Sequence, residues 1–221
     1  SRCSFCPERA EGNRYSCIKP QSVPRQVGDL SARYSPCLVH FLDNAMSPAL
    51  LKAIAGQGLT RPWYGFARFT AHLADPDFCM SLKRSGCTML QLGLESGDQG
   101  VLDSLDKGIR LEDASRALTN LREAGIGTYV YLLFGTPAED EDSARKTLHF
   151  TAGLGGCIDF LNVSVFNLPR GGDEAAGLCT YDFFEGDLSL YQGFSHPKGW
   201  DRGRVRQFLD KEFRRHPAIA A

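Results

Sequence analysis

The sequence lacks long apolar runs and an excess of charge of either sign. Its 221 residues carry 25 Lys and Arg against 26 Asp and Glu, which gives a formal net charge of -1. This balance argues against the basic surface with which proteins bind nucleic acid or anionic membranes. The longest apolar stretches, such as residues 129–134, are far shorter than the roughly 20 residues that cross a bilayer, and no signal segment opens the chain. We therefore expect a cytoplasmic protein that binds neither membranes nor nucleic acid.

Cysteines are few for the length, and most stand alone. Four of the eight lie singly among apolar residues or at the ends of expected helices, where a buried thiol is the ordinary interpretation: Cys37, Cys79, Cys87 and Cys157. Cys3 and Cys6 differ, because they form a C-x-x-C pair. The pair alone allows a zinc half-site, with Cys17 as the nearby third ligand, a redox dithiol, or part of an iron–sulfur ligand set. The chain opens on Ser1 without an initiator Met, so we expect it to begin inside a longer polypeptide.

From residue 22 onward, short apolar runs alternate with amphipathic stretches. Five runs predict strands, at residues 37–42, 64–70, 88–94, 128–134 and 160–166. Cap residues, prolines and glycines predict helices at residues 48–55, 76–85, 99–107, 111–124 and 138–152, and a last helix at 201–215. The acidic residues 139–142, Glu139 among them, read as charges that complement the start of their helix.

Strands that alternate with helices in this way predict a parallel α/β sheet, either a barrel or an open doubly wound sheet. Polar residues favour the barrel because they cluster just after the strands, at residues 43–44, 95–96 and 135–137, on the rim that carries the site in such barrels. A complete eight-stranded barrel takes about 250 residues, so five strands predict a partial one. We expect residues 1–169 to form this core and residues 170–221 to form a C-terminal extension.

Several motifs resemble those of the radical S-adenosylmethionine (SAM) enzymes. Cys3-Ser4-Phe5-Cys6 resembles the last two cysteines of the family's CxxxCxxC motif, with an aromatic residue before the third Cys. Residues 41–48, 91–108 and 131–139 are similar, in order, to the family's second-, fourth- and fifth-strand motifs. The resemblance extends through Pro169 and favours the branch that is often joined to an upstream cobalamin-binding domain. It implies a partial (β/α)6-type TIM-like barrel of parallel strands whose first strand, like the first cluster Cys, would precede Ser1.

The resemblance also implies an activity. A 4Fe-4S cluster would be held by Cys3, Cys6 and an upstream Cys, would be touched by Phe5, and would bind SAM through its remaining iron. Reductive cleavage of SAM would then yield a 5'-deoxyadenosyl radical that acts on an unknown substrate. An electron donor such as flavodoxin or ferredoxin and, through an upstream domain, cobalamin would complete the system. The alternative is a non-catalytic scaffold or a zinc module that uses the same C-x-x-C pair.

On the resemblance, the rim residues would contact SAM. Asp43 and Asn44 would accept hydrogen bonds from its ammonium group, and the alternative is that they form the cap of the helix after Ser47. Glu95, with Ser96, would reach the ribose or the ammonium, and the alternative is a solvated turn. Because these residues follow different strands, the prediction requires those strand ends to lie side by side.

Two further features belong to the same set. Gly135 and Pro137 would let the backbone approach the adenine side of SAM. Arg68 interrupts an apolar strand, so it is expected either to point into the barrel, toward a carboxylate such as that of Glu95 or of the cofactor, or to extend from an edge. Two cysteines leave a four-iron cluster incompletely held, so we expect this 221-residue chain to carry no intact cluster and to have a disordered or displaced loop from Ser1 to about Lys19.

Overall fold

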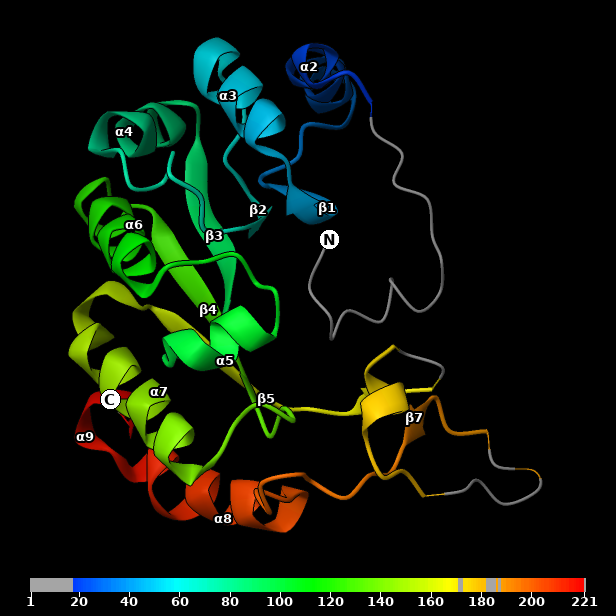
Figure 1. Cartoon of the computed structure of the whole chain (residues 1–221). Coiled ribbons are helices and arrows are strands. Elements are labelled where there is room, and N and C mark those ends of the chain that lie inside the picture. Colours follow the sequence, from blue (N-terminus) through cyan, green and yellow to red (C-terminus); the bar gives the residue numbers. More distant parts are fainter. Residues whose placement is uncertain (1–17, 171–172, 182–185, 187, 221) are drawn as a thin grey trace.

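A computed structural model of the chain describes residues 18–170, 173–181, 186 and 188–220 (Figure 1). Five strands form one sheet: β1 (Val39–Met46), β2 (Trp63–Ala67), β3 (Cys87–Glu95), β4 (Gly127–Phe134) and β5 (Phe160–Val165). Their order in the sheet is their order in the sequence, and every neighbouring pair is parallel. A doubly wound sheet would reverse its order partway, so this arrangement confirms the partial barrel.

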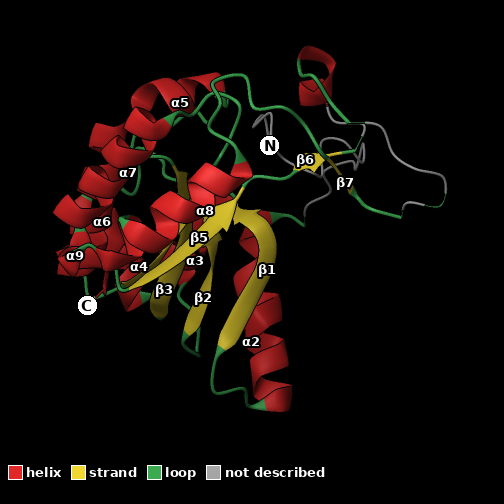
Figure 2. Ribbon diagram, turned by 90° about the horizontal axis from the view of Figure 1, so that it is seen from below, coloured by secondary structure: helices red, strands yellow, loops and turns green. Residues whose placement is uncertain are grey.

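Helices cover the outer face of the sheet (Figures 1 and 2). The strands β1 to β4 are followed by α3 (Pro48–Gln57), α4 (Pro76–Arg84), α6 (Leu111–Glu123) and α7 (Glu141–Gly153), and the short α5 (Gln99–Ser104) precedes α6. The predicted caps are confirmed, because the Ser47 side chain accepts a hydrogen bond from the backbone N–H of Leu50 and Asp75 accepts one from that of Asp77. The third helix is shorter than expected, since it ends at Ser104.

The core lies between this sheet and its helices. From Leu90 onward in β3, and along all of β4, every second side chain, including Leu92, Val130 and Leu132, is buried toward the helices. The intervening side chains are only partly buried and point to the opposite, inner face of the sheet. The alternation therefore gives the sheet one packed face and one accessible face.

The segment after β5 packs back onto this core. β6 (Leu168–Pro169) and β7 (Tyr191–Gln192) form a small antiparallel sheet, and η3 (Asp173–Gly177) lies between them in the sequence. α8 (Arg202–Lys211) and η4 (Phe213–Arg215) follow, and α9 (Pro217–Ala220) is the last helix described. Trp200, Val205, Phe208 and Phe213 belong to the same apolar cluster as the strands. The expected single helix at 201–215 is thus two helical segments, and both contribute buried residues to the core.

The edge of the sheet at β1 and the helix before it complete the fold. Among the described residues, β1 is an edge strand of the sheet. η1 (Pro20–Ser22) and α2 (Val23–Tyr34) precede it, and η2 (Gly155–Cys157) precedes β5. None of the helices in the described part of the chain has the length and hydropathy needed to span a bilayer.

Candidate functional site

The carboxyl ends of the strands carry most of the polar residues that the sequence analysis selected. A cavity of about 380 Å³ lies among these ends, between the end of β1, the residues after β2 and the loop that follows α5. Its lining includes Met46, Arg68, Thr70 and Lys107. Because the strands are parallel and adjacent, the candidate residues of different strands share this rim.

Glu95 ends β3 and forms an ion pair with Lys107. The Nζ atom of Lys107 donates to Oε1 of Glu95 at 2.6 Å, and the two side chains are only 8% and 13% exposed, respectively. Glu95 takes a positive φ of 70°, which turns the chain as the strand ends. Gly93 makes room for the pair, since a Cβ at that position would lie 2.6 Å from Oε1 of Glu95. The interpretation as a solvated turn is therefore wrong, because this carboxylate is enclosed and paired.

Arg68 follows β2 and reaches the same loop. Its guanidinium donates to the backbone carbonyl of Lys107 at 2.5 Å. The sequence predicts either that Arg68 points toward a carboxylate such as that of Glu95 or that it extends from an edge. Its side chain is partly buried, and this hydrogen bond holds the residue that pairs with Glu95. Two basic residues and one carboxylate thus come together from β2, β3 and the loop after α5.

Asp43 and Asn44 lie within β1, not after it, because that strand continues to Met46 with a shift of register between Phe41 and Met46. Both side chains are exposed. The cap of α3 is the side chain of Ser47, which accepts from the Leu50 N–H at 3.1 Å. The alternative that Asp43 and Asn44 form this cap is therefore wrong, and their proposed contact with a ligand stays a prediction.

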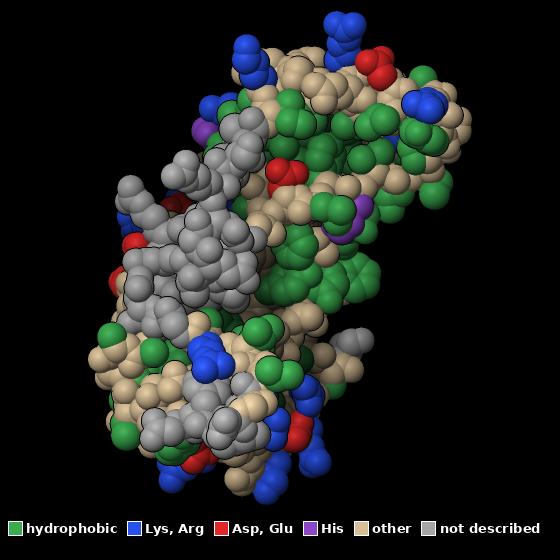
Figure 3. Space-filling view, turned by 90° about the vertical axis from the view of Figure 1, so that its right-hand side faces the viewer, with side chains coloured by type: hydrophobic (Ala, Val, Ile, Leu, Met, Phe, Trp, Pro, Cys, Tyr) green, Lys and Arg blue, Asp and Glu red, His purple; other side chains and the backbone are tan. Residues whose placement is uncertain are grey.

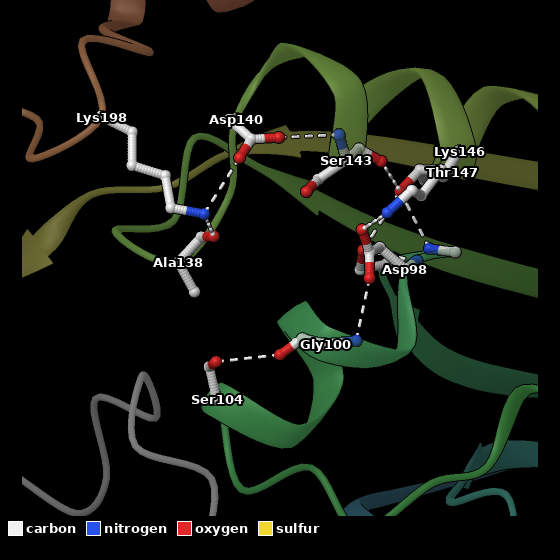
Figure 4. Close-up of polar contacts among 11 residues, drawn as sticks. Asp98, Gly100, Ser104, Ala138, Asp140, Ser143, Lys146, Thr147 and Lys198 are labelled. Atoms are coloured by element: carbon white, nitrogen blue, oxygen red, sulfur yellow. Dashed lines mark hydrogen bonds and ion pairs between the residues drawn. The ribbon is translucent and has the colours of Figure 1, made fainter.

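Ser96 supports the turn after β3 from inside the protein. Its buried hydroxyl lies 3.1 Å from the hydroxyl of Thr147 on α7 and accepts a hydrogen bond from the backbone N–H of Asp98. Asp98 pairs in turn with Lys146 at 2.8 Å (Figure 4). Burial opposes ionisation of Asp98, but hydrogen bonds from Lys146 and Gly100 outweigh it and hold its pKa below the usual value. The contacts of Ser96 therefore tie the β3 turn to α7.

The rim at β4 is built around Gly135 and Glu139. Gly135 takes a positive φ of 81°, and its N–H donates to Oε2 of Glu139 at 2.5 Å. The indole N–H of Trp200 donates to the same oxygen at 2.9 Å. Glu139 precedes α7, whose cap is Asp140, and it is fully buried. The interpretation of Glu139 as a helix-start charge is therefore wrong.

Burial raises the pKa of Glu139 to about 7, although the hydrogen bonds from Gly135 and Trp200 act in the opposite direction. Its second oxygen, Oε1, has no hydrogen-bond partner within the described part of the chain. An unpaired oxygen inside the protein favours the protonated, neutral acid. The carboxyl group of Glu139 thus changes charge close to neutral pH while it holds the Gly135 turn.

Residues after β7 fix the rest of this loop. His196 Nε2 lies 2.9 Å from the carbonyl oxygen of Thr136, which is next to Pro137. Lys198 donates to the carbonyl of Ala138 at 2.6 Å and pairs with Asp140 at 3.0 Å (Figure 4). Sequence analysis missed His196, Lys198, Trp200 and Lys107 as parts of the rim. Of these four residues, only Lys107 had a local signal in the sequence, since it is a cation in the last turn of the helix predicted at residues 99–107.

Cys3, Phe5 and Cys6, as well as Cys17 and most of the predicted Ser1 to Lys19 loop, lie outside the described residues. Among the residues that are described, no three His, Cys, Asp or Glu side chains come together in a metal-binding group. The described residues at the ends of adjacent strands that could meet SAM are the enclosed carboxylate of Glu95 and the partly buried Pro137. Gly135 is itself buried, and a Cβ there would lie 3.2 Å from Cγ2 of Val205.

Comparison with known proteins identifies the relatives of this fold. The family model described as the Radical SAM superfamily matches residues 1–151. An uncharacterized methyltransferase of Pyrococcus horikoshii is 22% identical over 170 residues, which are 74% of this chain and 36% of that protein. The bacteriochlorophyllide d C-12(1)-methyltransferase of Chlorobaculum tepidum is 32% identical over 79 residues, which are 35% of this chain and 17% of that protein.

Solved structures agree with this similarity at the level of the fold. The radical S-adenosylmethionine methyltransferase TsrM from Kitasatospora setae, solved with cobalamin and a 4Fe-4S cluster bound, superimposes with a TM-score of 0.63 at 24% identity. The match covers 76% of this chain and 32% of that one. The Pyrococcus horikoshii protein and TsrM each match most of this chain, but the chain spans only about a third of the length of either one.

Proposed function

Because the chain belongs to the radical SAM superfamily, we propose that it is the barrel part of an enzyme that binds a 4Fe-4S cluster and cleaves SAM reductively. When bound, the cluster and SAM supply one-electron chemistry that generates a carbon-centred radical. The observation that carries the proposal is the rim, where the Glu95–Lys107 pair and the Gly135 turn end two adjacent parallel strands of a half-barrel. A family match over residues 1–151 supports the same chemistry.

Each rim residue has a part in this proposal. Cys3 and Cys6 ligate the cluster together with an upstream Cys, and Phe5 packs beside it. Glu95 accepts a hydrogen bond from the polar end of SAM, and Lys107 pairs with that carboxylate and holds it in place. Arg68 acts through Lys107, since it binds the carbonyl of that residue.

The remaining rim residues bind or orient the cofactor in a different way. The exposed side chains of Asp43 and Asn44 contribute acceptors for the SAM ammonium group. Pro137 and the turn at Gly135 lie on the adenine side of SAM. Gly135 is itself buried against Val205 and contributes through the positive φ that the turn requires. Ser96 acts indirectly, because its hydroxyl is committed to Thr147 and to the turn.

We further propose that the complete protein is a cobalamin-dependent methyltransferase with a cobalamin-binding domain upstream of this barrel. Two relatives are named methyltransferases, and the TsrM structure contains cobalamin. A flavodoxin or ferredoxin serves as the electron donor.

The test uses the longest natural polypeptide that contains this chain, reconstituted anaerobically with iron and sulfide. We expect about four irons and four sulfides per chain and formation of 5'-deoxyadenosine from SAM under reduction. Cys6→Ala should abolish both, whereas Cys179→Ala, at an exposed cysteine remote from the motif in sequence, should change neither. One zinc per chain without iron would overturn the proposal in favour of a zinc-binding scaffold.

A further inference from the structure

A turn that follows β7 holds the loop that follows β4. Nε2 of His196 lies 2.9 Å from the carbonyl oxygen of Thr136. Nζ of Lys198 donates to the carbonyl of Ala138 at 2.6 Å. These two carbonyl groups stand on either side of Pro137, which is partly buried. The C-terminal segment therefore fixes the part of the loop that the proposed function places on the adenine side of SAM.

The imidazole of His196 also holds its own turn together, the turn at residues 196–200. Its Nδ1 atom accepts hydrogen bonds from the backbone N–H groups of Lys198 and Trp200, each at 3.2 Å. The carbonyl of His196 accepts a third bond, from the N–H of Gly199 at 3.0 Å, and Gly199 takes a positive φ of 67°. The backbone position of Trp200, the residue that covers the buried carboxyl group at the β4 rim, thus depends on the lone pair of Nδ1.

These contacts determine the protonation state of the ring. A nitrogen that accepts two N–H hydrogen bonds must carry a lone pair, so Nδ1 is unprotonated and the proton of the neutral ring lies on Nε2. From Nε2 it is donated to the carbonyl of Thr136. A second proton would occupy Nδ1 and would face the two N–H groups, so the imidazolium ion is incompatible with this turn.

The surroundings of the ring also disfavour the charged form. Burial, the largest cause, lowers the pKa of His196 below its ordinary value of 6.5, and Lys198 acts in the same direction. The hydrogen bond to Thr136 and the carboxylates of Asp201 and Asp140 oppose this shift without cancelling it. α8, which follows the turn, adds three exposed cations: Arg202, Arg204 and Arg206. Figure 3 shows Lys and Arg side chains gathered at this lower end of the molecule.

We propose that His196 is a positioning residue that holds the loop after β4 only while its ring is neutral, so that protonation of Nδ1 in acid releases the 196–200 turn and weakens SAM binding. The effect on SAM rests on the proposed function, whereas the release of the turn rests on the contacts of His196. A released ring takes up a proton more readily than the held one. The contribution of His196 is therefore complete above pH 6.5 and is lost as the pH falls below it.

Two substitutions divide the contacts of His196 between them. Asn places an oxygen at the position of Nδ1, so His196→Asn keeps the acceptor of the turn and loses the bond to Thr136. Gln places an amide nitrogen near the position of Nε2, so His196→Gln keeps that donor and loses the acceptor. Neither variant titrates at this position. His196→Gln thus imitates the released turn at every pH, and His196→Asn imitates the held one.

The first measurement is the state of the ring in the 221-residue chain, by long-range nitrogen–proton NMR with labelled histidine. The signal of His196 is the one of five that disappears in His196→Gln. We expect the Nε2–H tautomer at pH 7.5 and protonation only below pH 6.5. An Nδ1–H tautomer, or a ring that is charged at pH 7.5, would overturn the proposal.

The second measurement is the release of the turn, by fluorine NMR of 5-fluorotryptophan. The chain has two tryptophans, and Trp63, which is fully buried in β2, is the internal control. Every protein carries Glu139→Gln, because Glu139 bonds to the indole of Trp200 and itself titrates close to neutral pH. We expect the Trp200 signal to move from that of His196→Asn toward that of His196→Gln as the ring takes up its proton. A Trp200 signal that stays constant while the ring titrates would overturn the proposal.

The third measurement is the dissociation constant of SAM for the reconstituted natural polypeptide, at pH 7.5 and 5.5. The unaltered protein is compared with His196→Gln, because SAM and the other titrating groups are common to both. We expect the unaltered protein to bind SAM about three- to tenfold more tightly at pH 7.5, the equivalent of one hydrogen bond, and this advantage to shrink at pH 5.5. His149→Gln, at an exposed histidine on α7, should bind SAM as the unaltered protein does.

The outcomes separate the positioning role from the proposed function. An advantage over His196→Gln that is absent, or equal at both pH values, would overturn the positioning role while SAM binding itself upholds the proposed function. A reconstituted polypeptide that binds no SAM would overturn the proposed function. The two NMR measurements need neither cluster nor SAM, so they would still decide whether protonation of His196 releases the turn.

Discussion

Glu139→Gln provides a direct test of the buried carboxyl group at the β4 rim. Glutamine has nearly the same shape, and its carbonyl oxygen accepts the same two hydrogen bonds, from the Gly135 N–H and the Trp200 indole. The substitution therefore removes the ability to ionise while it preserves the network. Any difference between the two proteins that varies with pH then reports the charge of Glu139.

The size and sign of the effect follow from the pKa of Glu139. It is about 7 in the folded protein, against an ordinary value of 4.5, so the folded state binds the proton more tightly than the unfolded state does. Stability from this group is present in full below pH 4.5 and is lost as the pH rises through 7. The difference in pKa corresponds to about 3 kcal/mol.

The assay is the free energy of unfolding in urea from pH 4.5 to 8, measured for both proteins. We expect the stability of Glu139→Gln relative to the unaltered protein to rise by about 3 kcal/mol over this range. The hydrogen bond from the Ser143 N–H lowers the pKa of Asp140 to about 2. Asp140 is present in both proteins, so its contribution to the pH dependence cancels in the difference. Glu123→Gln, at an exposed position on α6, should give a flat difference. A flat or falling difference for Glu139→Gln would refute the reasoning.

Three further predictions concern the rim, the sheet edge and a helix cap. Glu95→Gln should weaken SAM binding by the reconstituted natural polypeptide about tenfold, and it should lower the free energy of unfolding in urea by about 1–3 kcal/mol because Lys107 loses its charged partner. Adding Lys107→Met should restore the stability but not the SAM binding. Unchanged SAM binding in Glu95→Gln would contradict the assignment. The edge of β1, which is unpaired among the described residues, is expected to pair with a second copy of the chain, so analytical ultracentrifugation should show dimers. Leu42→Lys, at an 81% exposed position on β1, should convert them to monomers. A monomeric unaltered chain would contradict this. Ser47→Ala should cost about 1 kcal/mol in urea unfolding, and Ser47→Asp should retain that stability; equal loss in both would contradict the cap.

The elements of the half-barrel were predictable because local patterns determine them. β4 alternates buried and partly buried residues along its whole length, which is the period of a strand with two different faces. Ser47-Pro48 and Asp75-Pro76 begin helices, as this pair of residue types predicts. The predicted parallel order also followed from alternation, since each helix returns the chain to the same end of the sheet. α2 was missed, because Pro24 and Gly28 weaken its helical pattern.

The polar contacts of the rim were not predictable, because they join distant positions. Glu95 meets Lys107 across 12 residues, and Glu139 meets Trp200 across 61. Sequence analysis found the acidic members from their places beside strand ends, but it had no means of choosing their partners. For Glu139 this gave the wrong environment, since a carboxylate near a helix start is ordinarily solvated, whereas the packing of Trp200 encloses this one.

The same contacts bear on which part of the chain makes the site. The Gly135 turn belongs to the barrel strands, yet Trp200 supplies one of the two hydrogen bonds to Glu139, and His196 contacts the carbonyl of Thr136. Without residues beyond 170, Glu139 would keep only the Gly135 N–H and would be open to solvent where Trp200 now covers it. Its pKa would then fall toward the ordinary value, since burial is what raises it. The protonation state of the β4 rim is therefore a property of the barrel and the C-terminal segment together.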